Sequence, residues 1–353
     1  MAKKKKETKN ETVAVRVLKA VAVIMGIIVI LLALVFLGAQ LYFGVPVIDY
    51  YRSSERAFTI PGLSDDMVPQ GFDYLESEGL YLIGGYQKDG SASRVYRVDK
   101  ATGKSQGYVA LANSDGSSLA PHAGGLAAHG DYLYVAGDED PFVYVFDLSE
   151  VLTGEDGSSV KTLGTFDTKC FGDGIRADFM CFTEDRFIVG EFYKDPNYPT
   201  PDSHVIVTST GEENRALAYS YKLSDGEGSS FGIEMIPSEV YSLPGLVQGI
   251  TVYEGKMWIS QSYATQKSTI CCYDVFGSEP VDHKTDIPVY ALDGSTLVSS
   301  FEAPPMAEEI VIIDGKMYIM CESASNKYFF GNLTGGRWCY ATDINKVLDK
   351  AGF

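Results

Sequence analysis

Apolar and polar positions form one short unit that recurs along the chain. Its clearest copy lies within residues 306–328, MAEEIVIIDGKMYIMCESASNKY. There the pattern predicts two antiparallel strands, Ile310–Ile313 and Lys316–Met320, joined at Asp314-Gly315, a dipeptide typical of two-residue hairpin turns. Carboxylates stand at the open end of this hairpin: Glu308, Glu309 and Glu322.

Five segments share this unit, each with an apolar strand, a polar turn and a second apolar strand that carries an aromatic residue. They span residues 70–85, 124–137, 177–190, 248–261 and 308–321. Their aromatic residues are Tyr81, Tyr134, Phe187, Trp258 and Tyr318, spaced 53, 53, 71 and 60 residues apart. A third strand is predicted after every unit, and a fourth strand after the first four.

A period near 50 residues with four strands per repeat is typical of a β-propeller. The last repeat lacks a fourth strand of its own, and Arg56–Ile60 near the other end of the chain can supply it. We therefore predict an all-β fold, a five-bladed β-propeller whose last blade is closed by residues 56–60. The long third repeat leaves a six-bladed ring as the alternative. A linear β-solenoid would leave the complementary N-terminal strand unexplained.

The N-terminal region has a different character. No charged residue occurs from Ala20 to Ile48, and seven Lys and Arg residues precede this stretch. We predict a cytoplasmic basic tail at 1–19, a transmembrane signal-anchor helix at 20–44 and an extracytoplasmic propeller at 45–353, in a single-pass cell-membrane protein with an extracellular C-terminal domain. A cleaved signal peptide is the alternative, although its apolar core is normally about 7–15 residues long.

Charge divides along the same boundary. Residues 1–48 carry a net charge of +5, so the whole-chain charge of −18 leaves −23 on the remainder. A strongly acidic domain argues against nucleic acid and against anionic membrane surfaces as partners. It suits simple solubility, cation binding or a basic partner.

Six cysteines fall in the exported part. Disulfides are permitted outside the cell, and Cys321 and Cys339 are expected on adjacent strands of one blade. A large domain does not need such bonds, so buried free thiols are an equal alternative. No pair of cysteines has the spacing of a metal site.

Several motifs resemble those of a known family. Val247-Gln248-Gly249-Ile250 and Glu308-Glu309-Ile310-Val311 are similar to motifs in a family of uncharacterised bacterial exported β-propeller proteins. His122-Ala123-Gly124-Gly125-Leu126 is similar to the H-x-G-G-[IL] element of its second blade. The resemblance covers about residues 66 to 345 and implies the fold and the export. It implies no catalytic residue.

Polar residues recur where the first strand of each blade begins and where the second ends. These two points lie on the same face of a propeller, so their side chains are expected to converge on the mouth of the central channel. The predicted binding residues are Gln70, His122, Asp178, Glu191, Gln248, Glu308, Glu309 and Glu322. Asp138 occupies the corresponding position in the second blade.

Three chemical interpretations compete with a purely structural role for these residues. The favoured one is recognition of a glycan, a peptide or an envelope component. The second is hydrolysis of a glycan with Asp178 and Glu308 as the catalytic pair, or a metal-dependent hydrolysis. The third is a Ca²⁺ site formed by Asp178, Glu308 and Glu309. Alternatively, these side chains cap blade backbones. His204 falls in a loop and is expected to be solvated.

Overall fold

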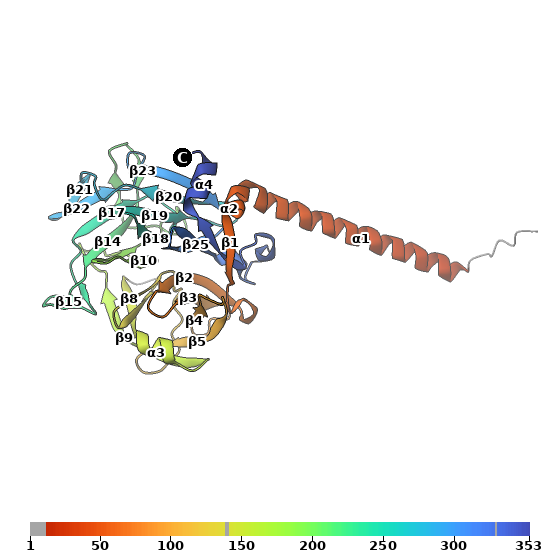
Figure 1. Cartoon of the computed structure of the whole chain (residues 1–353), viewed down its shortest axis with the longest axis horizontal. Helices are drawn as coiled ribbons and strands as arrows, with labels where there is room; N and C mark the ends of the chain where they lie inside the picture. The colour runs from red at the N-terminus through yellow and green to blue at the C-terminus, as the bar shows by residue number, and fades with distance from the viewer. Residues whose placement is uncertain (1–11, 138–140, 329) are drawn as a thin grey trace, which may run out of the picture.

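The computed structural model describes residues 12–137, 141–328 and 330–353, and its body is built almost wholly from β-strands (Figure 1). The long strands form five antiparallel meanders of four strands each. The first contains β2 (Met67–Leu75), β3 (Leu80–Gln87), β4 (Arg94–Asp99) and β5 (Ser105–Ala112). The second contains β6 (Leu126–His129), β7 (Tyr132–Ala136), β8 (Phe142–Asp147) and β9 (Ser158–Asp167).

The other three meanders follow the same plan. The third contains β10 (Phe179–Phe182), β11 (Arg186–Gly190), β14 (Ala216–Lys222) and β17 (Glu239–Leu243). The fourth contains β18 (Val247–Tyr253), β19 (Lys256–Gln261), β20 (Ser268–Tyr273) and β23 (Leu297–Ala303). The fifth contains β24 (Ala307–Ile313), β25 (Lys316–Cys321), β26 (Trp338–Asp343) and β1 (Ser54–Thr59), which comes from the N-terminal end of the body.

The innermost strands form a closed ring. β2 contacts β6, β6 contacts β10, β10 contacts β18, β18 contacts β24, and β24 returns to β2. β5 and β9 also pair in parallel, so the first two meanders hydrogen-bond as one eight-stranded sheet. This is the propeller-like, all-β arrangement that the repeats predict.

The hydrophobic core lies between neighbouring meanders. Five apolar clusters occur in the described residues, and each joins side chains from two adjacent meanders. The repeated aromatics are all buried within them. Because each sheet is covered on both faces, its strands are apolar on both faces, as in β24. The Asp314-Gly315 turn of the β24–β25 hairpin has the two positive φ angles of a type I′ turn, 52° and 73°.

Insertions decorate the third meander without forming another. Two short ribbons arise in its connections. β12 (Ile206–Val207) pairs with β13 (Glu213–Asn214) between β11 and β14, and β15 (Ser229–Ser230) pairs with β16 (Ile233–Glu234) between β14 and β17. β21 (Asp282–Lys284) and β22 (Ile287–Ala291) extend its outer edge, because β22 pairs in parallel with β17. The sequence pattern predicts a loop at Gly277–Asp286, so periodicity does not reveal β21, which lies within it.

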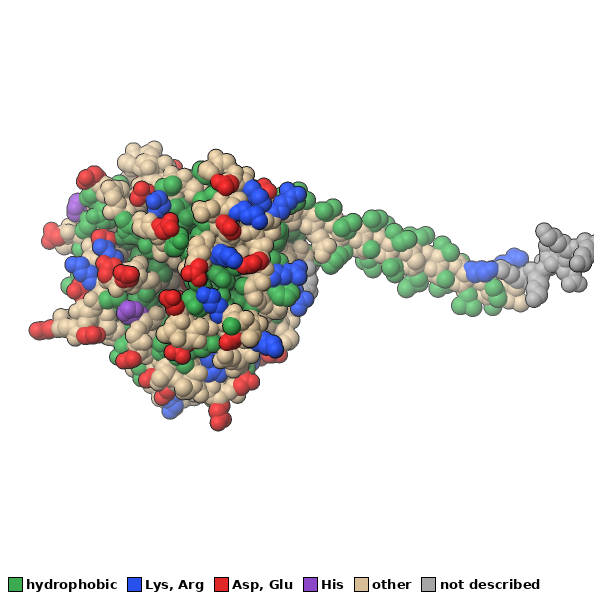
Figure 2. Space-filling model, in the orientation of Figure 1, with side chains coloured by type: hydrophobic (Ala, Val, Ile, Leu, Met, Phe, Trp, Pro, Cys, Tyr) green, Lys and Arg blue, Asp and Glu red, His purple; other side chains and the backbone are tan. Residues whose placement is uncertain are grey.

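Helix α1 (Val13–Gly44) projects from the body as a rod, and apolar side chains cover the face of it that Figure 2 shows. None of its residues is buried in the body, and it is long and apolar enough to span a membrane. It begins seven residues before the predicted start, at Ala20. A short turn leads to α2 (Ile48–Ser53), which packs on α4 (Ile344–Ala351), while α3 (Leu148–Thr153) follows β8.

All six cysteines are free thiols. Cys321 and Cys339 do lie on adjacent strands, β25 and β26. The register pairs Ile319 with Tyr340, so the two cysteines are not directly opposed. Cys339 instead faces Phe58 of β1.

Candidate functional site

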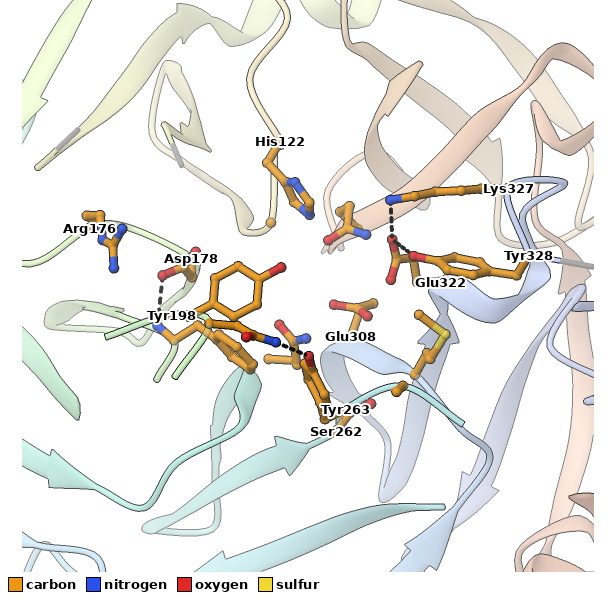
Figure 3. Close-up of a pocket in the computed structure, with 17 residues that line it drawn as sticks. His122, Arg176, Asp178, Tyr198, Ser262, Tyr263, Glu308, Glu322, Lys327 and Tyr328 are labelled. Carbon is orange, nitrogen blue, oxygen red and sulfur yellow. Dashed lines mark hydrogen bonds and ion pairs between the residues drawn. The ribbon is translucent and has the colours of Figure 1, made fainter. Parts of the chain in front are cut away.

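A cavity of about 520 Å³ opens where the inner strands begin (Figure 3). Its lining includes six of the eight residues predicted to bind at the channel mouth. They are Gln70, His122, Asp178, Gln248, Glu308 and Glu322. Each comes from a different inner strand or an adjoining connection, so closure of the ring brings together residues more than 250 positions apart in the chain.

Irregular pairing explains how the inner strands present these side chains. The register of β2, β18 and β24 against the next strand shifts at Pro69/Phe72, Val247/Gly249 and Ala307/Ile310. Such bulges bend a strand and redirect its side chains. Gln70, Gln248 and Glu308 lie within the three bulges and line the cavity.

In two of the bulges the next residue is a glycine, because neighbouring inner strands approach each other closely there. A Cβ atom at Gly71 would lie 2.5 Å from Leu126 Cβ, and one at Gly249 would lie 2.6 Å from the Glu308 carbonyl oxygen. Only glycine fits at these two points. The fifth meander instead has Glu309 at the corresponding position.

Glu309 does not line the cavity, which corrects the expectation that it stands at the mouth. Its carboxylate accepts hydrogen bonds from the backbone N–H of Ile250, at 3.1 Å, and of Met180, at 3.5 Å. Glu309 therefore ties the inner strands of the third and fourth meanders to the fifth. Burial raises the pKa of its carboxyl well above the usual range, the two N–H donors partly offset this, and Asp73 adds to the rise.

Glu308 is the most deeply buried carboxyl of the cavity, with 2% of its surface exposed. Burial raises its pKa well above the usual range, and the carboxylates of Glu322 and Glu309 raise it further, while Lys327 opposes them. This raised pKa favours the protonated form of the carboxyl. It offers the cavity a hydrogen-bond donor as well as an acceptor.

Glu322 stands beside Glu308 in a different environment. Its Oε1 accepts hydrogen bonds from the hydroxyls of Tyr328, at 2.7 Å, and Tyr86, at 3.1 Å. The Lys327 ammonium lies 3.8 Å from the same oxygen, donates to the Tyr86 hydroxyl and sits over the Tyr86 and Tyr328 rings. These groups are the donors that a carboxylate requires.

Asp178 stands on the other side of the cavity, near the start of β10. Its Oδ2 accepts the backbone N–H of Phe192 at 2.7 Å. The segment that follows Phe192 covers this side, where Asn197 Nδ2 donates to the Tyr263 hydroxyl at 3.0 Å and the Phe192 and Tyr198 rings meet edge to face. This wall is aromatic, and Tyr328 makes the wall near Glu322 aromatic too.

Two buried polar atoms point to an occupant. Gln70 Nε2 and Ser262 Oγ have no hydrogen-bond partner among the described residues, although each side chain is only 2% exposed. Both residues line the cavity. An unpaired buried donor costs about 1–3 kcal/mol, so a ligand that bonds to these atoms would recover that energy.

Glu191 also lies outside the cavity, contrary to the expectation that it stands at the mouth. Its Oε1 lies 2.6 Å from His204 Nδ1 and accepts the Leu217 N–H at 3.0 Å. Burial raises the pKa of this carboxyl and His204 lowers it. His204 is itself buried, not solvated as its position in a predicted loop suggests. Asp138, the corresponding residue of the second meander, lies outside the described residues.

The predicted Ca²⁺ ligands are not brought together. Asp178 and Glu308 line the cavity, but Glu309 is directed into the ring of inner strands. Within residues 12–137, 141–328 and 330–353, no three His, Cys, Asp or Glu side chains are arranged to hold a metal ion.

Comparison with known proteins leaves the site unassigned. No family model and no curated protein matches the chain. The solved structures similar to it include Myxococcus xanthus glutaminyl cyclase (9% identity, 82% of this chain and 94% of that chain, TM-score 0.41). They also include a PQQ-bound aldose sugar dehydrogenase from Streptomyces coelicolor (13% identity, 81% of this chain and 95% of that chain, TM-score 0.42). A third is an exo-β-1,3-galactanase from Phanerochaete chrysosporium (10% identity, 82% of this chain and 63% of that chain, TM-score 0.43). At these identities and TM-scores the likenesses carry no argument about function.

The cavity also contains residues that sequence reasoning did not select as binding residues. Its aromatic walls come from connections outside the repeated hairpins: Phe192, Tyr198, Tyr263 and Tyr328. The only available signal was position, because each of these residues follows the second strand of its repeat by a few residues. Tyrosine is common throughout this chain, so residue type alone could not distinguish them.

Proposed function

We propose that this chain is a membrane-anchored, five-bladed β-propeller that recognises a polyhydroxylated ligand, such as a glycan, in the cavity at its channel mouth. Five meanders and five apolar clusters between them support the blade count. Arg16, Lys19 and the lysines before them favour a cytoplasmic N-terminus, with the acidic body on the outer side.

The observation that carries the ligand class is the pairing of unsatisfied polar atoms with aromatic walls. Gln70 Nε2 and Ser262 Oγ need partners, and Glu308 and Glu322 present a donor and an acceptor nearby. Hydroxyl groups both donate and accept, so a sugar can satisfy all of them. The C–H faces of a sugar ring can pack on the negatively polarised faces of Tyr and Phe rings. The volume lies within the roughly 300–1,000 Å³ of small-molecule sites.

Replacing Ser262 by alanine tests this proposal with little change to the fold. Ser262→Ala should weaken binding of a glycan hit about tenfold, because it removes one ligand hydrogen bond. Its melting temperature without ligand should equal or exceed that of the wild type, because an unpaired buried hydroxyl is lost. Binding is measured by calorimetry with oligosaccharides that raise the melting temperature in a panel.

Ser242→Ala is the matched control. Ser242 Oγ is equally buried and unpaired among the described residues, but it lies in β17 outside the cavity. This variant should bind like the wild type. If no oligosaccharide stabilises the protein, or if both variants lose affinity equally, the proposed function is wrong.

Hydrolysis of a glycan is the second candidate, and one observation favours it. Burial raises the pKa of Glu308 and favours its protonated form, while Glu322 beside it is surrounded by hydrogen-bond donors. Two carboxyls in contrasting environments are typical of glycosidase acid and base pairs. Asp178, expected from sequence as the partner of Glu308, is the alternative base. Its Oδ2 already accepts the Phe192 N–H.

If the protein is a hydrolase, Glu308→Gln should lower kcat by about 10²–10⁴-fold without changing the melting temperature, because the amide cannot deliver a proton. Wild-type kcat/KM should fall as pH rises through the raised pKa of Glu308, and it should also fall at low pH where the second carboxylate becomes protonated, which gives a bell-shaped profile. Parallel assays of Asp178→Asn and Glu322→Gln identify the second carboxylate. Unchanged turnover in Glu308→Gln, or no turnover of any glycan by the wild type, would eliminate this candidate.

A further inference from the structure

The membrane anchor and the cavity are joined by a short path of ring contacts. From this path we infer that the ligand is the saccharide headgroup of an uncharged membrane glycolipid, presented from the bilayer that α1 enters. The inference rests on the proposed function, because it specifies the source of the ligand for the same cavity.

The sequence of α1 sets where the bilayer ends. Lys19 is the last charged residue before the apolar stretch, and Tyr42 and Phe43 stand at its far end. At about 1.5 Å per residue the helix from Lys19 to Tyr42 spans about 35 Å, slightly more than the roughly 30 Å hydrocarbon core. Tyrosine rings favour the interface between lipid and water, and the Tyr42 side chain is exposed. The outer surface of the bilayer therefore lies near Tyr42 and Phe43.

Two successive ring contacts lead from this level into the cavity. The Phe43 ring stacks on Phe330 with centroids 5.9 Å apart, and Phe330 meets Tyr328 at 5.6 Å. Tyr328 lines the cavity and donates its hydroxyl to Glu322. The wall of the cavity thus begins two aromatic rings from the lipid surface.

A second set of contacts fixes the distance between the cavity and the expected lipid surface. The Tyr51 hydroxyl, on α2 just after the anchor, donates to the Thr334 carbonyl at 2.5 Å. Thr334 Oγ1 lies 3.1 Å from Ser323 Oγ, next to Glu322 in the sequence. The segment that carries Glu322 and Tyr328 is therefore bonded to the extension of the anchor itself. The cavity is not on a flexible tether that would let it move away from the membrane.

This placement favours a ligand confined to the same membrane. A lipid headgroup that shares the bilayer with the anchor meets the cavity at a high effective concentration, whereas a dissolved sugar gains nothing from the anchor. Charge narrows the choice of lipid. Residues after 48 carry a net charge of −23, so anionic headgroups are repelled by the body as a whole. The cavity itself has Arg176 and Lys327 as well as Asp178 and Glu322 in its lining, so it holds cations beside its carboxylates and does not demand a charged ligand. A neutral saccharide headgroup satisfies the unpaired donors without this cost.

The experiment uses the full chain in nanodiscs of phosphatidylcholine alone or mixed with galactosyl or glucosyl diacylglycerol. The readout is the melting temperature of the body. We expect at least one glycolipid to raise it by several degrees, Ser262→Ala to reduce that rise, and Ser242→Ala to leave it unchanged. The corresponding soluble methyl glycosides, at the same total concentration, should produce a much smaller shift.

A variant with a flexible Gly/Ser linker of roughly 30 residues inserted after Gly44 separates the anchor from the cavity. It should lose most of the glycolipid response and keep the response to saturating soluble glycoside. If soluble sugars stabilise the protein and glycolipids do not, or if the linker leaves the glycolipid response intact, the inference fails while the proposed function stands. If neither glycolipids nor a soluble oligosaccharide panel produces a shift, the proposed function fails as well.

Discussion

Phe58→Ala should destabilise the body by about 3–5 kcal/mol, the usual cost of emptying a buried phenylalanine site. Phe58 belongs to β1, the strand that the N-terminal end of the body contributes to the last meander, and it is 2% exposed. Its ring packs 4.9 Å from Tyr81 of the first meander. The substitution therefore removes packing at the point where the ring of meanders closes. The change in free energy of unfolding is measured by denaturant unfolding followed by circular dichroism.

Phe353→Ala is the control, because the Phe353 side chain is mostly exposed and should contribute less than about 0.5 kcal/mol.

Deleting residues 50–62 removes β1 altogether and exposes the edge of β26. Limited proteolysis should then cut first within the last meander, before cleavage elsewhere. Equal protease resistance in the deleted and intact proteins would contradict closure by β1.

Asp73→Asn should gain stability relative to the wild type as pH rises, by up to about 4 kcal/mol between pH 4 and neutral pH. The amide also carries a pH-independent cost, because its single oxygen can accept only one of the two N–H groups that the carboxylate accepts. Burial raises the pKa of Asp73 from 3.8 to about 7, although its carboxylate accepts N–H groups of Ala128 and Tyr74. The folded protein thus holds this proton more tightly than the unfolded chain does. As pH rises above 3.8 the unfolded state ionises first, and stability falls until the folded carboxyl ionises near pH 7.

The difference in free energy of unfolding between wild type and Asp73→Asn, measured from pH 4 to pH 8, isolates this effect. Asparagine is uncharged at every pH, as the protonated acid is, so the difference should grow with pH and level off above about 7, on top of a constant offset from the lost hydrogen bond. Asp131→Asn, at an exposed aspartate, should show no such growth. A difference that is independent of pH would show that Asp73 titrates normally in the folded protein.

The repeated hairpins, their order and the apolar N-terminal helix could be predicted because each depends on neighbouring residues. An Asp-Gly turn between two apolar runs specifies its hairpin locally, and the same pattern five times specifies a ring of similar sheets. The strand at 54–59 could be found because the last repeat was one strand short. Local pattern also indicated that Gln70, Gln248, Asp178 and Glu308 begin inner strands, and these side chains do line one cavity.

Local sequence pattern cannot distinguish two adjacent identical residues. Glu308 and Glu309 look equivalent in the sequence, yet a bulge in β24 turns the first toward the cavity and the second toward Ile250 and Met180. Glu191 matched Glu322 in its repeat position, but a buried His204 from an insertion engages it. Both outcomes depend on which backbone N–H or imidazole comes within hydrogen-bond distance after folding. Ile250 and Met180 are 59 and 129 residues from Glu309, and His204 is 13 residues from Glu191 in an insertion outside the repeated pattern.

By itself, then, the sequence determined the repeated sheets, the strand that completes the last of them and the apolar helix, because these follow from hydrophobic periodicity and turn chemistry within short windows. The tertiary structure alone decided which carboxyls share a cavity, which are buried as structural ties, and that helix α1 lies two ring contacts from Tyr328 in the cavity wall. Those properties arise from the close approach of strands and loops far apart in the chain, where packing and desolvation set the direction and the proton affinity of each side chain.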